Sequence, residues 1–235
     1  MKKLIMTDLD CTLLPMDQDA YIKIYVNAIA KLFYEHGFDG KQIAKATMQS
    51  AYAMGKNDGS RTNAVVFEEA FKALAGERAQ QAIDLFPKVY EEPYNAIKAV
   101  TRVNEYAEQI VKLMREKAEF VVVATQPMFP LEAVEKRLSW TNLSYDMFDD
   151  ITVYDNCSFS KPSTGYYKEI MEKFGATAET TVMFGNDVNE DILPCKELGI
   201  ETFLLTDGLI NTKNHDISNF RRGNYLDMIE YLKSL

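Results

Sequence analysis

The sequence contains few cysteines, histidines and prolines, and fewer glycines than an average protein. Its 235 residues include 3 Cys, 2 His, 7 Pro, 11 Gly and 1 Trp. The three cysteines are scattered and too few for a disulfide framework, and with two histidines they form no zinc-site spacing. With 47% hydrophobic and 26% charged residues, the composition also excludes a disordered or collagen-like chain. The chain is therefore expected to fold by itself, as one or two domains.

Positive charge is scarce as well. Lys and Arg total 26 against 35 for Asp and Glu, which gives a net charge of −9. Such a chain repels a nucleic-acid backbone and an anionic membrane surface. The uncharged stretch 120–131 is too short to span a bilayer, and Asp8 and Asp10 interrupt the N-terminus where a signal peptide would be apolar. We expect a soluble, cytoplasmic protein that binds neither nucleic acid nor membranes; the sequence predicts no particular oligomeric state.

Short apolar runs rich in β-branched and aromatic residues recur along the chain. Runs of this kind are typical of strands that are covered on both faces. Helical spacing of apolar residues lies between the later runs, for example over 167–174, and again near the C-terminus over 226–232. The alternation of strand and helix predicts an α/β fold with a parallel sheet. The expected strands are 4–9, 120–124, 151–154, 181–184 and 202–205.

A long segment separates the first two expected strands, where a single crossover helix would suffice. Apolar residues at helical spacing mark two helices within it, over 21–33 and 64–74, and no strand pattern appears. We therefore predict an inserted helical domain at 15–100. The core domain then consists of residues 1–14 and 101–235.

Two pairs of acidic residues follow expected strands, and ligands of open α/β sheets bind at the carboxyl ends of the strands. Asp8 and Asp10 flank one apolar residue, so on an extended chain both carboxylates project from the same side, within reach of one hard cation. Asp187 and Asp191 are four residues apart, on one face of a first helical turn. Considered alone, the first pair is equally compatible with a simple turn, and the second with a helix N-cap.

Three further polar residues fall after expected strands. Thr125 and Gln126 follow the second strand, and Lys161 lies directly before Pro162. Taken singly, Thr125 is equally consistent with a hydrogen-bonded loop hydroxyl, and Lys161 with a solvated surface lysine. The order of acidic pair, threonine, lysine and second acidic pair, with each element after its own strand, predicts that these residues form one site.

Asp8-Leu9-Asp10-Cys11-Thr12 resembles the first motif, DxDxT, of the haloacid dehalogenase superfamily, most of whose members handle phosphate esters. Thr125 is similar to the Thr or Ser of the second motif, Lys161 to the lysine of the third, and Gly185 through Asp191 to the acidic fourth. Cys11 stands where glycine is most frequent in the family. The resemblance implies a Rossmann-like core, and an insert directly after the first motif is similar to the class with an α-helical cap.

The resemblance also implies a Mg²⁺-dependent phosphatase that hydrolyses a small phosphorylated metabolite through an aspartyl-phosphate. Asp8 would be the nucleophile, and Asp10 would protonate the leaving group and then activate water. Mg²⁺ would be bound by Asp8, the main-chain carbonyl of Asp10 and Asp187, with Asp191 supporting these ligands. Lys161 would neutralise the phosphoryl group.

The remaining candidates concern substrate binding. Thr125 would donate its hydroxyl to a phosphoryl oxygen, and Gln126 beside it is a further candidate. Arg61 lies in the polar, turn-rich segment 55–61 of the insert, which is expected to contact the part of the substrate remote from phosphorus. The alternative for this segment is a solvated linker between two helices.

Other activities of the superfamily stay open at this point. Dehalogenases and phosphonoacetaldehyde hydrolases lack the second acid of the first motif, whereas Asp10 is present here. A phosphomutase uses the same core residues as a phosphatase. A non-catalytic binding protein with this fold usually loses an ionisable residue of the site, and here none is lost.

Overall fold

Six parallel strands form one sheet in this computed structural model, which describes residues 1–235. The strand order is β3-β2-β1-β4-β5-β6, that of a doubly wound, Rossmann-like sheet. The expected α/β fold is thereby confirmed. The strands are β1 (Lys2–Thr7), β2 (Ala118–Val123), β3 (Asp150–Ile151), β4 (Thr181–Gly185), β5 (Glu201–Leu205) and β6 (Arg222–Gly223).

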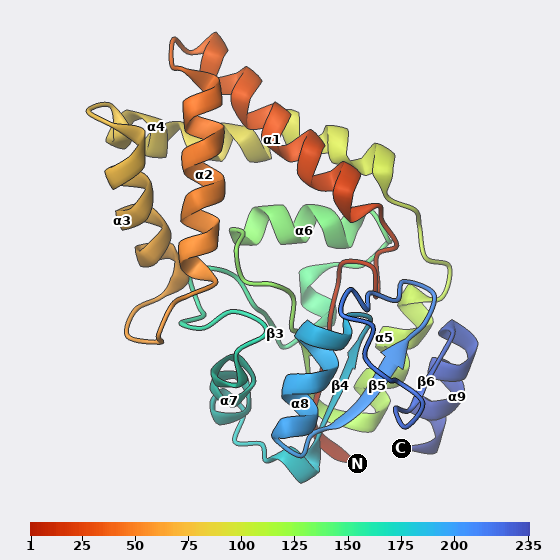
Figure 1. Cartoon of the computed structure of the whole chain (residues 1–235). Helices are drawn as coiled ribbons and strands as arrows, with labels where there is room; N and C mark the ends of the chain where they lie inside the picture. Colours follow the sequence, from red (N-terminus) through yellow and green to blue (C-terminus); the bar gives the residue numbers. More distant parts are fainter.

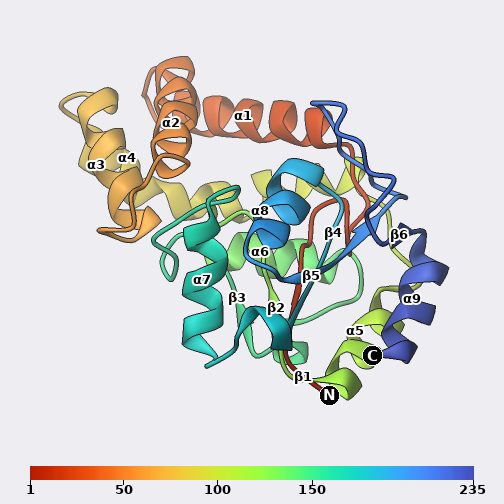
Figure 2. The same cartoon turned by 60° about the horizontal axis from the view of Figure 1, so that its bottom comes forward.

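Helices cover both faces of the sheet, which explains why its strands are continuous apolar runs. Successive side chains of a strand point to opposite faces. Ile5 of β1 packs into the cluster formed with α5 (Ala107–Lys117), α6 (Leu131–Ser139) and α9 (Tyr225–Ser234). Its neighbours Leu4 and Met6 pack into the cluster on the other face, with α7 (Thr164–Lys173) and α8 (Leu193–Glu197), as Figure 2 shows from below.

The segment between β1 and α5 is entirely helical and lies above the sheet in Figure 1. Asp17 and Asp39 cap the first two of its helices, since each side chain accepts a hydrogen bond from a main-chain N–H three residues ahead. The elements are α1 (Gln18–Glu35), α2 (Gly40–Met54), α3 (Asn63–Ala75), α4 (Ala79–Leu85) and the 3₁₀-helices η1 (Phe86–Tyr90) and η2 (Pro93–Val100).

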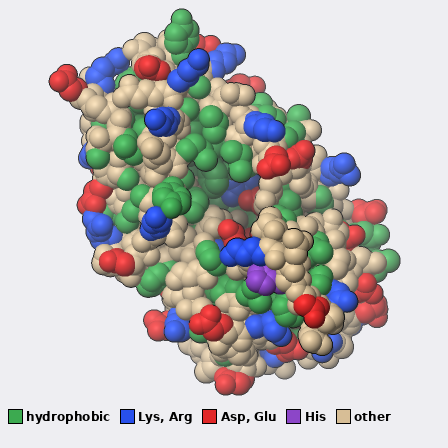
Figure 3. All heavy atoms as spheres, viewed as in Figure 1, with side chains coloured by type: hydrophobic (Ala, Val, Ile, Leu, Met, Phe, Trp, Pro, Cys, Tyr) green, Lys and Arg blue, Asp and Glu red, His purple; other side chains and the backbone are tan.

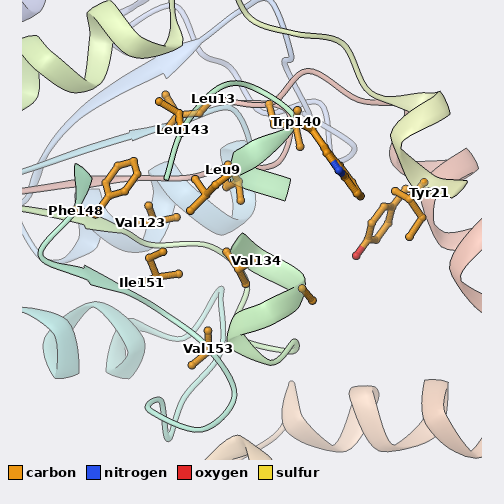
Figure 4. Packing of buried hydrophobic residues seen from close by; sticks show 14 of the residues in the cluster. Leu9, Leu13, Tyr21, Val123, Val134, Trp140, Leu143, Phe148, Ile151 and Val153 are labelled. Atoms are coloured by element: carbon orange, nitrogen blue, oxygen red, sulfur yellow. The ribbon is translucent and has the colours of Figure 1, made fainter. Parts of the chain in front are cut away.

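One hydrophobic cluster connects this helical segment to the sheet. Its 42 buried residues include Phe33 and Tyr94 from the segment and Val123 and Leu138 from the core. Figure 4 shows Tyr21 of α1 facing Trp140, which follows α6. The side chains at this junction therefore pack as one interior, and the division into domains at residues 15 and 100 stays a prediction.

The structure differs from the expected elements at two strands. β3 ends at Ile151 because the Asn156 side chain bonds Val153 N–H and the Ile151 carbonyl, which closes a turn in place of further pairing. β6 was not expected, since two residues give no periodic signal. No helix has the length and apolar character needed to cross a membrane.

Candidate active site

The carboxyl ends of β1, β2 and β4 bring the predicted residues together. The register pairs Thr7 with Val123 and with Phe184, so the three strands end at one edge of the sheet. The Asp8 N–H donates to the Phe184 carbonyl oxygen over 2.8 Å, which fixes the first residue after β1 against β4. Thr125 and Asp187 follow the neighbouring strand ends, as the sequence order predicts.

Lys161 is buried between two carboxylates. Its Nζ lies 2.8 Å from Asp8 Oδ1 and 2.6 Å from Asp191 Oδ1. The Gln126 amide holds the Lys161 backbone, since it accepts from the Lys161 N–H and donates to the Lys161 carbonyl oxygen. Burial alone would lower the pKa of Lys161, but the Asp191 and Asp8 carboxylates hold it well above its usual value. One fixed positive charge therefore faces Asp8.

Asp191 organises the loop that follows β4. Its Oδ2 accepts hydrogen bonds from the N–H groups of Asn186 and Asp187, each over 3.0 Å, while its Oδ1 binds Lys161. A Cβ at Gly185 would stand 2.3 Å from Asp191 Oδ2, so only glycine permits this close approach. Both oxygens of Asp191 are thus occupied by protein donors, and it supports the site rather than facing a metal.

Asp187 is the N-cap of the short helix η5 (Val188–Ile192), which the helix-cap alternative anticipated. Its Oδ1 accepts from the N–H groups of Asn189 and Glu190 over 2.7 and 2.9 Å. The other carboxylate oxygen has no protein donor among these contacts and is available to a ligand. Asp187 is therefore compatible with both roles considered for it, a helix cap and a metal ligand.

A small polar cavity of about 110 Å³ contains this group, and no hydrophobic residue lines it. It is strongly acidic, because five carboxylates face a single lysine. Burial raises the pKa of Asp8 to about 8, and the charges of Asp191 and Asp10 add to this effect. Burial likewise raises the pKa of Glu190 to about 7. The lining residues are Asp8, Asp10, Gln18, Thr125, Gln126, Lys161, Asn186, Asp187, Glu190 and Asp191.

The excess of carboxylate oxygen fits a hard divalent cation. However, no three His, Cys, Asp or Glu side chains converge as a metal site, because the Asp10 side chain pairs with Arg137 and that of Asp191 with Lys161. The predicted set of Asp8, Asp10, Asp187 and Asp191 is thus not a side-chain cage. The set that fits consists of the Asp8 and Asp187 carboxylates with the main-chain carbonyl of Asp10.

Arg137 of α6 is a site residue that the sequence interpretation missed. It is fully buried, and its Nε lies 3.2 Å from Asp10 Oδ1. Its Nη1 donates to the hydroxyls of Tyr94 and Tyr21 over 2.7 and 3.1 Å. Burial would lower the pKa of Arg137, but the Asp10 charge holds it well above the usual value. Conversely, burial raises the pKa of Asp10 and the Arg137 charge opposes that rise.

The sequence does contain a signal for Arg137. The buried face of α6 consists of Ala133, Val134 and Leu138, and Arg137 occupies the same stripe at helical spacing. An arginine in the apolar stripe of a helix is rarely buried without a charged partner. That pattern identifies a buried ion pair, although it does not identify Asp10 as the partner.

A larger cavity of about 580 Å³ adjoins the small one. The two share Asp10, Gln18, Gln126 and Glu190. Figure 3 shows the hollow between the helical segment and the core, with hydrophobic side chains around it. A molecule that reacts in the small cavity therefore has room for its remaining part in the larger one.

The structure does not bring Arg61 to either cavity. Its side chain is about half exposed and forms an ion pair with Glu69 of α3. Neither cavity has Arg61 in its lining, so its expected contact with the substrate has no support in this arrangement. Thr125 and Gln126 do line the small cavity, as expected of residues that contact a phosphoryl group.

Comparison with protein-family models places residues 2–208 in a match to the haloacid dehalogenase-like hydrolases. Two curated proteins named glyceraldehyde 3-phosphate phosphatase, from Methanothermobacter thermautotrophicus and Methanocaldococcus jannaschii, are 29% and 28% identical over 92 residues. Each match covers 39% of this chain and only 41% and 40% of those proteins. The likeness to these relatives thus spans about two fifths of either length.

Solved structures share the whole fold at low identity. A predicted phosphoglycolate phosphatase from Haemophilus somnus has a TM-score of 0.58 at 16% identity, covering 98% of this chain and 97% of its own. A 2-haloacid dehalogenase from Pseudomonas syringae has a TM-score of 0.66 at 16% identity, covering 100% and 99%. A Bacillus subtilis putative hydrolase bound to magnesium has a TM-score of 0.59 at 17% identity, covering 100% and 99%.

Proposed function

Since the chain belongs to the family of haloacid dehalogenase-like hydrolases, we propose that it is a Mg²⁺-dependent phosphatase acting on a small phosphate monoester. One observation carries this proposal: Asp8 and Asp10 border the same small polar cavity as Lys161, and Asp10 also borders the larger cavity. A phosphoryl group at Asp8 would thus have its ester oxygen near Asp10. Phosphatase-named relatives add support, although their similarity covers a minor part of the chain.

In the first step, a carboxylate oxygen of Asp8 attacks phosphorus and the bond between phosphorus and the ester oxygen breaks. The leaving oxygen takes a proton from Asp10, which burial keeps easier to protonate than an exposed carboxyl group. Lys161, 2.8 Å from Asp8, balances the charge that gathers on the phosphoryl oxygens. The products of this step are the free alcohol and an aspartyl-phosphate.

In the second step, Asp10 is a carboxylate and takes a proton from water. The water oxygen attacks phosphorus, the bond to the Asp8 oxygen breaks, and inorganic phosphate leaves. Asp8 and Asp10 thereby return to their starting states. Mg²⁺ bound by Asp8, Asp187 and the Asp10 carbonyl would supply further positive charge to the phosphoryl group in both steps.

The alternatives differ in what they need from Asp10. A dehalogenase has no ester oxygen to protonate, whereas the structure holds Asp10 beside Asp8 with a dedicated buried arginine. A non-catalytic binding protein has no need for a lysine fixed between two carboxylates. A phosphomutase needs the same residues and differs in its second acceptor, which would be a sugar hydroxyl instead of water.

The test is hydrolysis of 4-nitrophenyl phosphate with Mg²⁺, with a chelator, and by the Asp8→Asn variant. We expect phosphate release that requires Mg²⁺ and that Asp8→Asn abolishes, with Asp216→Asn as a matched control at an exposed aspartate. Chloride release from 2-chloropropionate without metal would favour the dehalogenase instead. Inactivity on both substrates, together with inactivity on a panel of phosphorylated metabolites, would favour a binding protein.

A further inference from the structure

The larger cavity has a composition that restricts the alcohol part of a substrate. Fourteen of its 23 lining residues are hydrophobic, and none is Lys, Arg or His. Its volume of about 580 Å³ is that of a small-molecule site and far exceeds what a two- or three-carbon acid needs. A second anionic group on the substrate would therefore find no positive partner there.

Aromatic rings form much of the wall. Tyr25 and Phe129 lie with their centroids 5.3 Å apart, and Phe67 and Tyr154 lie 6.4 Å apart on the side of α3. The Tyr25 hydroxyl is paired with the Tyr90 hydroxyl over 2.9 Å, so it is already engaged. The wall thus offers ring faces and edges, which bind apolar or aromatic groups.

Two hydrophobic side chains at the cavity remain exposed to solvent. Ile22 of α1 is 45% exposed and Met48 of α2 is 39% exposed, and both line the cavity. An apolar group bound between them would remove this surface from water, which is favourable. The exposure points to a hydrophobic ligand rather than a polar one.

Negative charge gathers on the opposite wall. Glu132, in the first turn of α6, and Asp155, after β3, lie close enough for the Glu132 charge to raise the pKa of Asp155. Neither side chain forms an ion pair, whereas Glu68, a third carboxylate of the wall, is paired with Lys72. An anionic group on the substrate would approach two uncompensated carboxylates.

From these observations we propose that the substrate is a phosphate monoester of a hydrophobic, ring-bearing alcohol that carries no second anionic group. The inference rests on the proposed phosphatase activity and adds the class of alcohol to it. Phosphate esters of small carboxylic acids are poor substrates in this view, because the carboxylate meets Glu132 and Asp155 and leaves the aromatic wall unfilled. A positively charged group on the alcohol is accepted.

Three aryl phosphates that differ in one charge test the electrostatic half. They are phenyl phosphates with an ethyl, a 2-aminoethyl or a 2-carboxyethyl group opposite the phosphate, so that the leaving phenol is nearly constant. We expect kcat/KM for the carboxyethyl compound to be about tenfold below that of the ethyl compound, since charges at such distances interact by about 1 kcal/mol or more. The aminoethyl compound should equal or exceed the ethyl compound.

The double variant Glu132→Gln/Asp155→Asn should bring the three values together. Glu135→Gln, on the same helix but outside the cavity, is the matched control and should keep the discrimination. For the apolar half, 2-phenylethyl phosphate should exceed ethyl phosphate roughly tenfold or more in kcat/KM, as expected when a phenyl ring is buried.

Calorimetric binding of the three free phenols separates this inference from the phosphatase proposal. If none of the phosphates is hydrolysed but the phenols bind in the expected order, the activity is wrong and the cavity's selectivity stands. If the phosphates are hydrolysed and the carboxyethyl compound equals the ethyl compound, the selectivity is wrong and the phosphatase stands. An unchanged preference in the double variant would also overturn the role given to Glu132 and Asp155.

Discussion

Replacing Arg137 by methionine tests whether the buried ion pair with Asp10 is as important as its geometry indicates. Methionine has a similar length and keeps the apolar packing, but it leaves Asp10 without its cation. Removing one member of a buried pair costs about 3–5 kcal/mol. Because the Asp10 side chain is 18% exposed and retains some solvent, we expect the lower end, about 3 kcal/mol. For a chain of this size that lowers Tm by roughly 6–12 °C.

The pH dependence of this loss follows from the direction of the Asp10 pKa. Burial holds the pKa of Asp10 above that of an unfolded carboxyl group, and Arg137 opposes the rise. Without Arg137 the pKa of Asp10 rises further, so Asp10 takes up a proton at mildly acidic pH and is no longer an unpaired charge. A group with a raised pKa costs stability as pH rises through that pKa. The loss caused by Arg137→Met should therefore be larger at pH 8 than at pH 5.

The reverse variant gives the contrasting result. Asp10→Asn leaves Arg137 buried and charged, and an arginine does not lose its proton in proteins. Its destabilisation should be independent of pH, and the double variant Arg137→Met/Asp10→Asn should be more stable than Asp10→Asn alone.

Chemical denaturation at both pH values measures these differences, with Arg115→Met as a control. Arg115 pairs with Asp149 at the surface, where such pairs contribute about 0.2–1 kcal/mol. The reasoning would be refuted if Arg137→Met cost no more than Arg115→Met, or if its cost did not change with pH.

Three further predictions concern the small cavity. Asp8→Asn should abolish phosphatase activity without unfolding the protein, since an amide does not attack phosphorus; thermal melting and phosphate release check both parts, and residual turnover near that of the parent would remove Asp8 as nucleophile. Asp187→Ala should raise the Mg²⁺ concentration for half-maximal rate at least tenfold, measured by metal titration, and an unchanged requirement would exclude Asp187 as a ligand. Because burial raises the pKa of Asp8 to about 8, Mg²⁺ must displace a proton there. Calorimetry should therefore show Mg²⁺ affinity rising from pH 6 to about pH 8, and a constant affinity would contradict the metal assignment.

The strand ends were predictable because their chemistry is local in sequence. Asp8, Thr125 and Asp187 each follow a recognisable apolar run, and a parallel sheet brings such ends to one edge. Arg137 was not predictable as a partner of Asp10, because the contact joins residues 127 positions apart through the packing of α6 against β1. Arg61 shows the opposite error, since a polar loop composition does not determine which way a side chain turns.

The same distinction applies to the cavities. The residues of the small cavity come from motifs with fixed spacing. The wall of the larger cavity is assembled from α1, α2, α3 and the loop after β3, and its composition emerges only when these elements pack. Glu132 and Asp155 carry no sequence signal that would distinguish them from ordinary surface acids.

The single hydrophobic cluster that joins the helical segment to the sheet has a thermodynamic consequence. Because the same 42 buried residues serve both parts, neither part has an interior that is complete without the other. Excising residues 15–100 would leave the apolar face of α6 uncovered, and the remaining chain would tend to aggregate. Heat should instead unfold the whole chain in one cooperative transition, in which the calorimetric and van't Hoff enthalpies agree.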